Sequence, residues 1–222
     1  AYQKLYANKG ATTQGIDDDT ADGFSDLYVK ELIQTLKDGA YKANPVRREY
    51  IPKKNGKLRP LGIPSFRDKL LQEVVRMILE AIYEPVFDSH SHGFRPGKSC
   101  HTALRQISSD FTGVVWFIEG DIKGCFDTIN HEKLIEILSR KIKDSRLLNI
   151  IRQFLKAGYI ENWKYNITYS GTPQGGICSP ILANIYLNEL DKKFREIAER
   201  FGKQRSAYKT PEYHAVDKEM KR

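Results

Sequence analysis

The feature that most constrains the fold is a short apolar run, Val114 to Ile118, in the middle of the 222-residue chain. A continuous apolar run of this length is typical of a strand that is buried on both faces. Apolar residues at helical spacing predict helices over residues 24–39, 66–84, 131–142, 146–157 and 179–201, and Ser99 can cap another. The order of helix, hairpin, helices, buried strand and helices predicts an α+β fold.

A β-hairpin is predicted around Asn55-Gly56, the strongest short hairpin signal in the chain. Prolines at positions 52, 60 and 64 favour edge strands or short strands, because proline cannot donate to a sheet. The turn is surrounded by four cations: Lys53, Lys54, Lys57 and Arg59. Such a tip can close over phosphates, or it can be a solvated edge protected by lysine, which is the commoner case.

Composition excludes several classes of protein. The 36 basic and 28 acidic residues give a net charge of +8, which permits a polyanionic partner without naming it. The three cysteines form no C-x-x-C pair, which excludes a disulfide scaffold or zinc ribbon and favours a reducing compartment, here the cytoplasm. No apolar run approaches the ~20 residues of a membrane span, and the N-terminus lacks the apolar region of a secretory signal.

Two segments carry residues suited to chemistry. Asp121 follows the predicted buried strand and adjoins a tight turn, where it can hold a divalent cation or cap the turn at 123–127. The segment 171–176, GTPQGG, precedes a helix and can bring backbone close to a ligand, or it can be an ordinary turn. Other candidates have structural interpretations: His90, His92 and His101 as loop residues, His131 at a helix start, and Trp116, Phe117 and Tyr186 in the core.

Taken in order, these segments resemble the reverse transcriptase family, and most of all the maturases of group II introns. RPLGIPSFRDKLLQ, SHGFRPGKSCHTAL, GDIKGCFDTINH and GTPQGGICSPILANIYLNELD match four successive blocks, and YANKGATTQGID resembles the N-terminal extension of the non-retroviral branch. The resemblance covers residues 8–200 and implies a right-hand polymerase with fingers and a partial palm. It implies an N-terminal arm at 1–22, fingers at 23–112, a partial palm at 113–201 and a charged tail at 202–222, which begins an insertion.

The resemblance also implies roles for single residues. Asp121 matches the first metal-binding aspartate of the palm, and the Ile122 carbonyl matches a group that helps hold the second Mg²⁺ ion. The implied nucleotide-binding positions are Lys53 and Arg59 on the triphosphate, Gly124 and Cys125 through backbone N–H groups, Phe126 beneath the sugar, and Gln174 over the nucleotide. Arg95 and Gly175 match positions near the RNA template; Arg95 can equally brace its loop, and Phe126 can be a core aromatic.

One departure from the family pattern limits what the chain can do. The family completes its metal site with a Y-x-D-D hairpin after the helix that follows TPQGG, and this sequence contains no Y-x-D-D motif. The only consecutive acids, Asp17 to Asp19, lie about 100 residues before Asp121, in the wrong order for that hairpin. The chain therefore looks like a fragment that ends in the insertion before Y-x-D-D, and it is not expected to polymerise unaided.

The expected activity of the intact protein is RNA-directed DNA synthesis. The resemblance implies two Mg²⁺ ions, dNTPs, an RNA template and a DNA primer as its cofactors and substrates, and binding of group II intron RNA that assists splicing and mobility. The alternative is a noncatalytic RNA-binding maturase that retains the fold. An RNA-dependent RNA polymerase is disfavoured, because such enzymes must admit a 2′-hydroxyl and usually have no bulky aromatic at the position that Phe126 matches. A membrane is not expected, and the sequence leaves open which intron is bound and whether the chain forms a homodimer.

Overall fold

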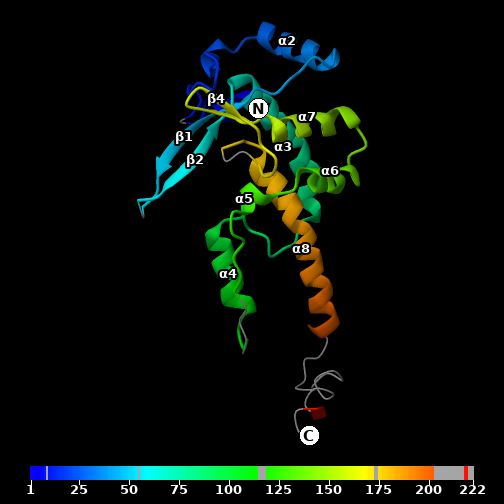
Figure 1. Cartoon of the computed structure of the whole chain (residues 1–222). Coiled ribbons are helices and arrows are strands. Elements are labelled where there is room, and N and C mark those ends of the chain that lie inside the picture. The colour runs from blue at the N-terminus through cyan, green and yellow to red at the C-terminus, as the bar shows by residue number, and fades with distance from the viewer. Residues whose placement is uncertain (9, 55, 115–118, 173–174, 203–217, 220–222) are drawn as a thin grey trace.

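The computed structural model describes residues 1–8, 10–54, 56–114, 119–172, 175–202 and 218–219 (Figure 1). The helices are α1 Tyr2–Tyr6, α2 Asp26–Lys37, α3 Phe66–Tyr83, α4 Cys100–Asp110, α5 Cys125–Thr128, α6 His131–Ser139, α7 Ser145–Lys156 and α8 Ser179–Gly202. The strands are β1 Val46–Pro52, β2 Leu58–Ile63, β3 Tyr159–Glu161 and β4 Lys164–Asn166. This mixture confirms the α+β class, while the core of the predicted buried strand, 115–118, lies outside the described residues.

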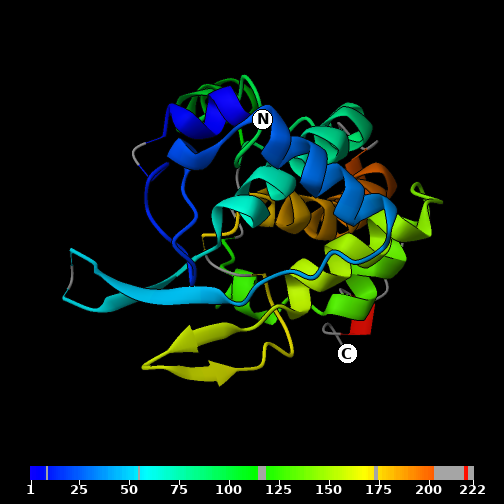
Figure 2. The ribbon, with the colours of Figure 1, turned by 90° about the horizontal axis from the view of Figure 1, so that it is seen from above.

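The four strands form one sheet in the order β2-β1-β3-β4. β1 and β2 are antiparallel, with Tyr50 opposite Pro60, which confirms the predicted hairpin and places that proline on an edge strand. β1 pairs with β3 in parallel, and β3 pairs with β4 in a second hairpin that the sequence pattern did not reveal. Both hairpins project from the helical body in the same direction (Figure 2).

Helix α3 is the centre of the core. Its buried apolar side chains are Phe66, Leu70, Leu71, Val75, Leu79 and Tyr83. The helical spacing that predicts this helix also places Val74 and Ile78 on its apolar face, but they are 39% and 40% exposed, so that part of the prediction is wrong. In their place the helix buries four polar residues, Asp68, Lys69, Gln72 and Glu73. Buried polar groups need hydrogen-bond partners, so neighbouring segments must supply them.

The N-terminal segment supplies several of those partners. The predicted N-terminal arm contains α1 and leads into a short 3₁₀ turn, Ala21–Gly23, and it is anchored by the buried side chains of Leu5 and Ala21. The ammonium of Lys4 pairs with the carboxylate of Glu73 at 3.2 Å. Lys69 Nζ donates to the carbonyl oxygen of Thr13 at 2.7 Å. The polar composition of this segment concealed its docking, because much of the attachment is made through polar groups of α3.

The polypeptide around Asp121 lies away from this core. Helix α4 begins with the predicted cap at Ser99, which forms a capping box, but it buries none of its residues. Apolar side chains of α4 and of the distal part of α8 are exposed, among them Leu104, Ile107, Phe194 and Ile197. Both helices extend from the body on the side opposite the N-terminal segment (Figure 1). No helix in the described part of the chain is long and apolar enough to cross a membrane.

Candidate nucleotide-binding site

The two segments singled out for chemistry lie side by side. Gly171 N donates to the carbonyl oxygen of Ile129, and Thr172 N donates to that of Phe126, both at 2.7 Å. His131 is buried at the start of α6, and its Nε2 donates to the carbonyl oxygen of Gly171 at 2.7 Å. The turn that carries Phe126 is therefore hydrogen-bonded to Gly171 and Thr172, where the TPQGG loop (residues 172–176) begins. The two segments are more than 40 residues apart in the sequence. The sequence interpretation gave His131 only a local role, and no pattern of spacing pointed to this contact.

Gly171 is a position where the close approach requires glycine. Its φ of +84° lies in the left-handed region, and an added Cβ would lie 2.6 Å from the carbonyl oxygen of Phe126. We expect Gly171→Ala to lower the free energy of unfolding by about 2–4 kcal/mol, because it combines a left-handed penalty with a backbone collision. Urea unfolding of this chain measures the loss.

Gly39 provides the matched control for that substitution. Its φ is +67°, but an added Cβ would meet nothing within 4 Å. Gly39→Ala should therefore cost only the conformational penalty, about 1–2 kcal/mol. Equal losses in the two variants would show that the contact between Gly171 and the Phe126 turn contributes nothing.

The other end of the same loop packs on the first hairpin. Gly175 has a φ of +104°, and a Cβ there would lie 2.4 Å from the carbonyl oxygen of Gly62 in β2. Two residues further on, Ile177 N donates to Gln72 Oε1 of α3 at 2.8 Å. The hairpin, the Phe126 turn and the TPQGG loop thus meet at one place. Gln174 lies outside the described residues, so its predicted position over a nucleotide stays a prediction.

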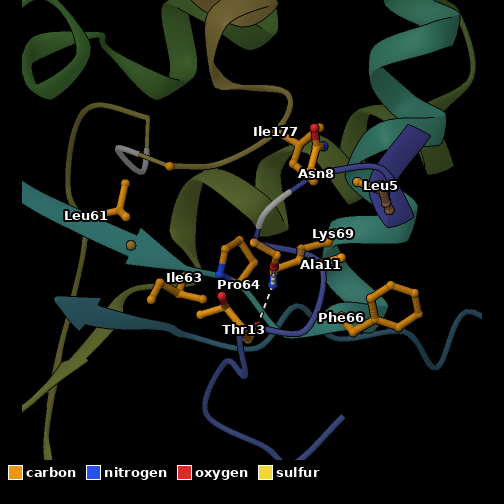
Figure 3. A pocket seen from close by; sticks show the side chains of 13 residues that line it. Leu5, Asn8, Ala11, Thr13, Leu61, Ile63, Pro64, Phe66, Lys69 and Ile177 are labelled. Atoms are coloured by element: carbon orange, nitrogen blue, oxygen red, sulfur yellow. Dashed lines mark hydrogen bonds between the residues drawn. The ribbon is translucent and has the colours of Figure 1, made fainter. Parts of the chain in front are cut away.

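A small pocket opens where these elements meet the N-terminal segment (Figure 3). It has a volume of about 240 Å³ and is lined by residues of the N-terminal segment, β2, the start of α3 and the TPQGG loop, including Ala11, Thr13, Leu61, Phe66, Lys69 and Gly175. Burial lowers the pKa of Lys69, whose ammonium also donates to Gly10 O at 3.3 Å. Lys69 thus attaches the N-terminal segment to α3, and this segment lines the pocket together with Gly175.

The residues of the Asp121 segment are more open. Asp121 and Ile122 are exposed on backbone without regular secondary structure. Gly124, with a φ of +61°, occupies the position before α5, so the alternative in which Asp121 caps this turn is wrong. Burial raises the pKa of the half-buried Cys125 thiol. Phe126 is half-buried, and its ring meets the edge of Phe94 at a centroid distance of 6.3 Å.

The predicted triphosphate clamp lies at the end of the first hairpin. Lys53 and Arg59 are both exposed, and Lys53 N donates to Lys57 O at 2.7 Å across the turn. Both side chains are free to move toward a ligand, because neither is buried. Their contact with a triphosphate stays a prediction.

Arg95 braces its own loop. Its guanidinium pairs with Glu84 at 2.8 Å and donates to the carbonyl oxygens of Asp88 and Ser91 at 2.6 and 2.7 Å. Only 7% of the side chain is exposed, and the guanidinium lies 5.2 Å from the centre of the Phe87 ring. These contacts favour the bracing alternative, while contact of Arg95 with an RNA template stays a prediction.

The described residues do not make a complete magnesium site. No three His, Cys, Asp or Glu side chains among them gather as metal ligands. One carboxylate and one backbone carbonyl, at Asp121 and Ile122, are too few oxygen ligands for Mg²⁺ held by protein alone. A catalytic ion would need further carboxylates from other residues of the protein.

A basic hairpin, an aspartate ahead of an aromatic-bearing turn, and a glycine-rich loop packed on both are the parts that define the fingers and palm of a nucleic-acid polymerase. Residues 51–209 match the family model described as reverse transcriptase (RNA-dependent DNA polymerase). The chain belongs to this family.

Individual relatives agree with the predicted resemblance. The chain is 61% identical to the group II intron-encoded protein LtrA of Lactococcus lactis subsp. cremoris, over 100% of its own length and 37% of that protein's. It is 53% identical to a 91 kDa protein in the cob intron of Schizosaccharomyces pombe, over 90% of the chain and 25% of that protein. A solved partial Cas6-RT-Cas1–Cas2 complex shares the fold at 22% identity with a TM-score of 0.51, covering 88% of this chain and 33% of the other. The chain thus spans between 25% and 37% of the length of these three proteins.

Proposed function

We propose that this chain forms the fingers and partial palm of a group II intron reverse transcriptase, and that the protein containing it copies RNA into DNA. The supporting observation is the pair of backbone hydrogen bonds that join Gly171 and Thr172 to the Phe126 turn. They bring together the two segments to which the resemblance gives the metal and nucleotide roles. Packing of Gly175 on Gly62 adds the basic hairpin to the same place.

Each part has a proposed task in nucleotide addition. Lys53 and Arg59 bind the triphosphate by charge-assisted hydrogen bonds, and the ring of Phe126 supports the deoxyribose. The pocket beside Gly175 takes the template base. Asp121 and the Ile122 carbonyl supply oxygen ligands to Mg²⁺, which would stabilise the attacking and leaving oxygens of the phosphoryl transfer. The remaining metal ligands would come from other residues of the protein.

Primer extension tests the proposal in an extended protein that supplies the rest of the relatives' length. With an RNA template, a DNA primer, dNTPs and Mg²⁺, we expect template-directed DNA synthesis that stops when the metal is chelated. A protein that binds the primer and template but extends no primer would instead support the alternative of a noncatalytic maturase.

Binding of RNA is expected even for the 222-residue chain alone. The net charge of +8 and the cations of the first hairpin favour contacts with phosphates. If four cations contact phosphates, affinity for a group II intron RNA should fall about a hundredfold between 50 and 200 mM salt. A titration at several salt concentrations measures the slope. The double substitution of Lys53 and Lys54 by Gln should flatten it, and an affinity indifferent to salt would contradict phosphate contact.

A further inference from the structure

The second hairpin displays a tryptophan in an unusual conformation. β3 and β4 are joined by Asn162 and Trp163, whose φ angles are +50° and +62°. Two-residue hairpin turns with both φ values positive favour glycine at the second position, because side chains are strained there. Trp163 is nevertheless 99% exposed, so the ring contributes little to packing. Strained backbone of this kind is enriched at functional sites, and here it presents a large aromatic ring to solvent.

Trp163 is one of the residues that line a wide groove. The groove has a volume of about 840 Å³ and is lined by Gln14–Asp18 of the N-terminal segment, Arg47–Tyr50 of β1 and Ile160–Trp163 of the second hairpin. Its walls are tied together. The Arg47 guanidinium donates to the carbonyl oxygens of Gln14 and Gly15 at 2.9 and 3.0 Å, and the Tyr50 hydroxyl donates to Glu161. The groove is therefore a built feature rather than a gap between loose loops.

The polar groups of this groove suit the edge of a nucleobase better than a phosphate. Its four carboxylates are Asp17, Asp18, Glu49 and Glu161, against two arginines. Carboxylates repel phosphate, but they accept hydrogen bonds from the exocyclic amino groups of cytosine, adenine and guanine. One arginine, Arg48, lies 3.8 Å from the centre of the Tyr159 ring, and its buried Nε has no acceptor within the described residues. The groove thus offers an aromatic face, acceptors and an unpaired donor.

Cations for the phosphates lie outside the groove, on the same end of the sheet. Lys164 follows Trp163 directly and is exposed. The parallel pairs Val46–Tyr159 and Arg47–Ile160 direct both hairpins the same way from the body, and Lys53 lies exposed at the turn of the first hairpin. Figure 2 shows the two hairpin ends projecting together. An aromatic platform flanked by cations is the arrangement that binds single-stranded nucleic acids.

We propose that this groove binds an unpaired base of RNA, which stacks on Trp163 and presents its amino group to the groove carboxylates, while the flanking phosphates face Lys164 and the basic hairpin. The inference rests on the proposed function for the presence of an RNA partner. It adds a site for a single flipped-out base, with a preference for cytosine, adenine or guanine over uracil.

Binding of dye-labelled oligonucleotides to the 222-residue chain tests the site, with oligo(rC), oligo(rA) and oligo(rU) as the probes. Trp163→Ala should weaken binding of oligo(rC) about tenfold, since stacking of a base on an aromatic side chain has an effect of this size. Trp163→Phe should lose less than threefold, because it keeps a ring. Tyr169→Ala is the matched control: Tyr169 is a highly exposed aromatic outside the groove, and its loss should leave affinity unchanged.

Three further measurements separate base stacking from phosphate contacts, from the role of the carboxylates and from contacts between copies of the chain. In Trp163→Ala the slope of log affinity against log salt should equal that of the wild type, because no phosphate contact is lost. In the double variant Asp18→Asn, Glu161→Gln, the ratio of the affinity for oligo(rC) to the affinity for oligo(rU) should move closer to one. Sedimentation velocity should show the same mass for wild type and Trp163→Ala.

The outcomes that overturn the proposal are distinct from those that overturn the function. If the wild type binds RNA and Trp163→Ala binds it equally, the base site is wrong while the proposed function stands. If the wild type prefers oligo(rU), the assignment of the carboxylates is wrong. A change of mass in Trp163→Ala with unchanged RNA affinity would assign the groove to a second copy of the chain. Absence of RNA binding by the 222-residue chain would remove the base site, while primer extension by the extended protein decides the proposed function.

Discussion

Asp121→Asn should abolish DNA synthesis in an extended protein that carries the remaining metal ligands. Asparagine keeps the size of the side chain but removes the negative charge that a carboxylate brings to Mg²⁺. We expect the rate of primer extension to fall at least about a thousandfold, which corresponds to about 4 kcal/mol of lost transition-state stabilisation. The variant should remain folded, because Asp121 is exposed and outside the core.

A matched substitution separates the role of Asp121 from a general effect of charge. Glu119 is an exposed acid two residues earlier, and Glu119→Gln removes the same charge. It should leave the extension rate within about twofold of the wild type. RNA affinity should be unchanged in both variants, since neither removes a cation. Extension near the wild-type rate by Asp121→Asn would exclude this residue from catalysis.

Phe126→Ala should admit ribonucleotides. If Asp121 holds a metal ion, the turn that carries Phe126 returns beneath the sugar, and a rigid ring there collides with a 2′-hydroxyl. This collision weakens the binding of rNTPs and does not strengthen the binding of dNTPs. We expect the ratio of kcat/KM for rNTP over dNTP to rise at least tenfold, or about 1.4 kcal/mol of discrimination.

The competing explanation for Phe126 is a role in packing. A fully buried phenylalanine would lose about 3–5 kcal/mol of stability on truncation, with no change in sugar preference. Phe126 is only half-buried, however, so a smaller loss is expected and the variant should fold. Phe94→Ala is the control for packing between the two rings. It removes the ring that meets Phe126, and the Phe94 side chain itself is 74% exposed. A folded Phe126→Ala that discriminates as strongly as the wild type would show that this ring is not the gate.

Local sequence signals predicted the elements that the structure shows around the site. Asn-Gly predicted the first hairpin, and helical spacing predicted α2, α3, α6, α7 and α8 to within a few residues. Ser99 was predicted as a cap and forms one. The ordered motifs predicted the family, which the match over residues 51–209 confirms. The hairpin, helix and cap signals each depend on a few neighbouring residues. The family was predicted from sequence motifs and their order along the chain.

Periodicity failed where polar groups are buried. On α3 it placed Val74 and Ile78 inside, and it gave no reason to bury Asp68. The buried Asp68 carboxylate accepts hydrogen bonds from the Tyr41 hydroxyl at 2.5 Å and from Asn44 N at 2.8 Å. Burial raises the pKa of that carboxyl group. The free energy of burying such a group depends on partners supplied by distant segments, and a window of sequence does not contain them.

The sequence by itself determined which residues are proposed for nucleotide chemistry, because residue type decides whether a group can bind a metal, a phosphate or a base. It also determined the hairpin, the caps and most helices, since these depend on local hydrogen bonds and spacing. Only the tertiary structure decided that His131 and Gly171 join the Phe126 turn to the TPQGG loop, and that Trp163 lines a groove with Tyr50. The residues brought together in this way lie about 40 and more than 100 positions apart in the sequence. They form only when the packing of the whole domain offsets the entropy of closing such long loops.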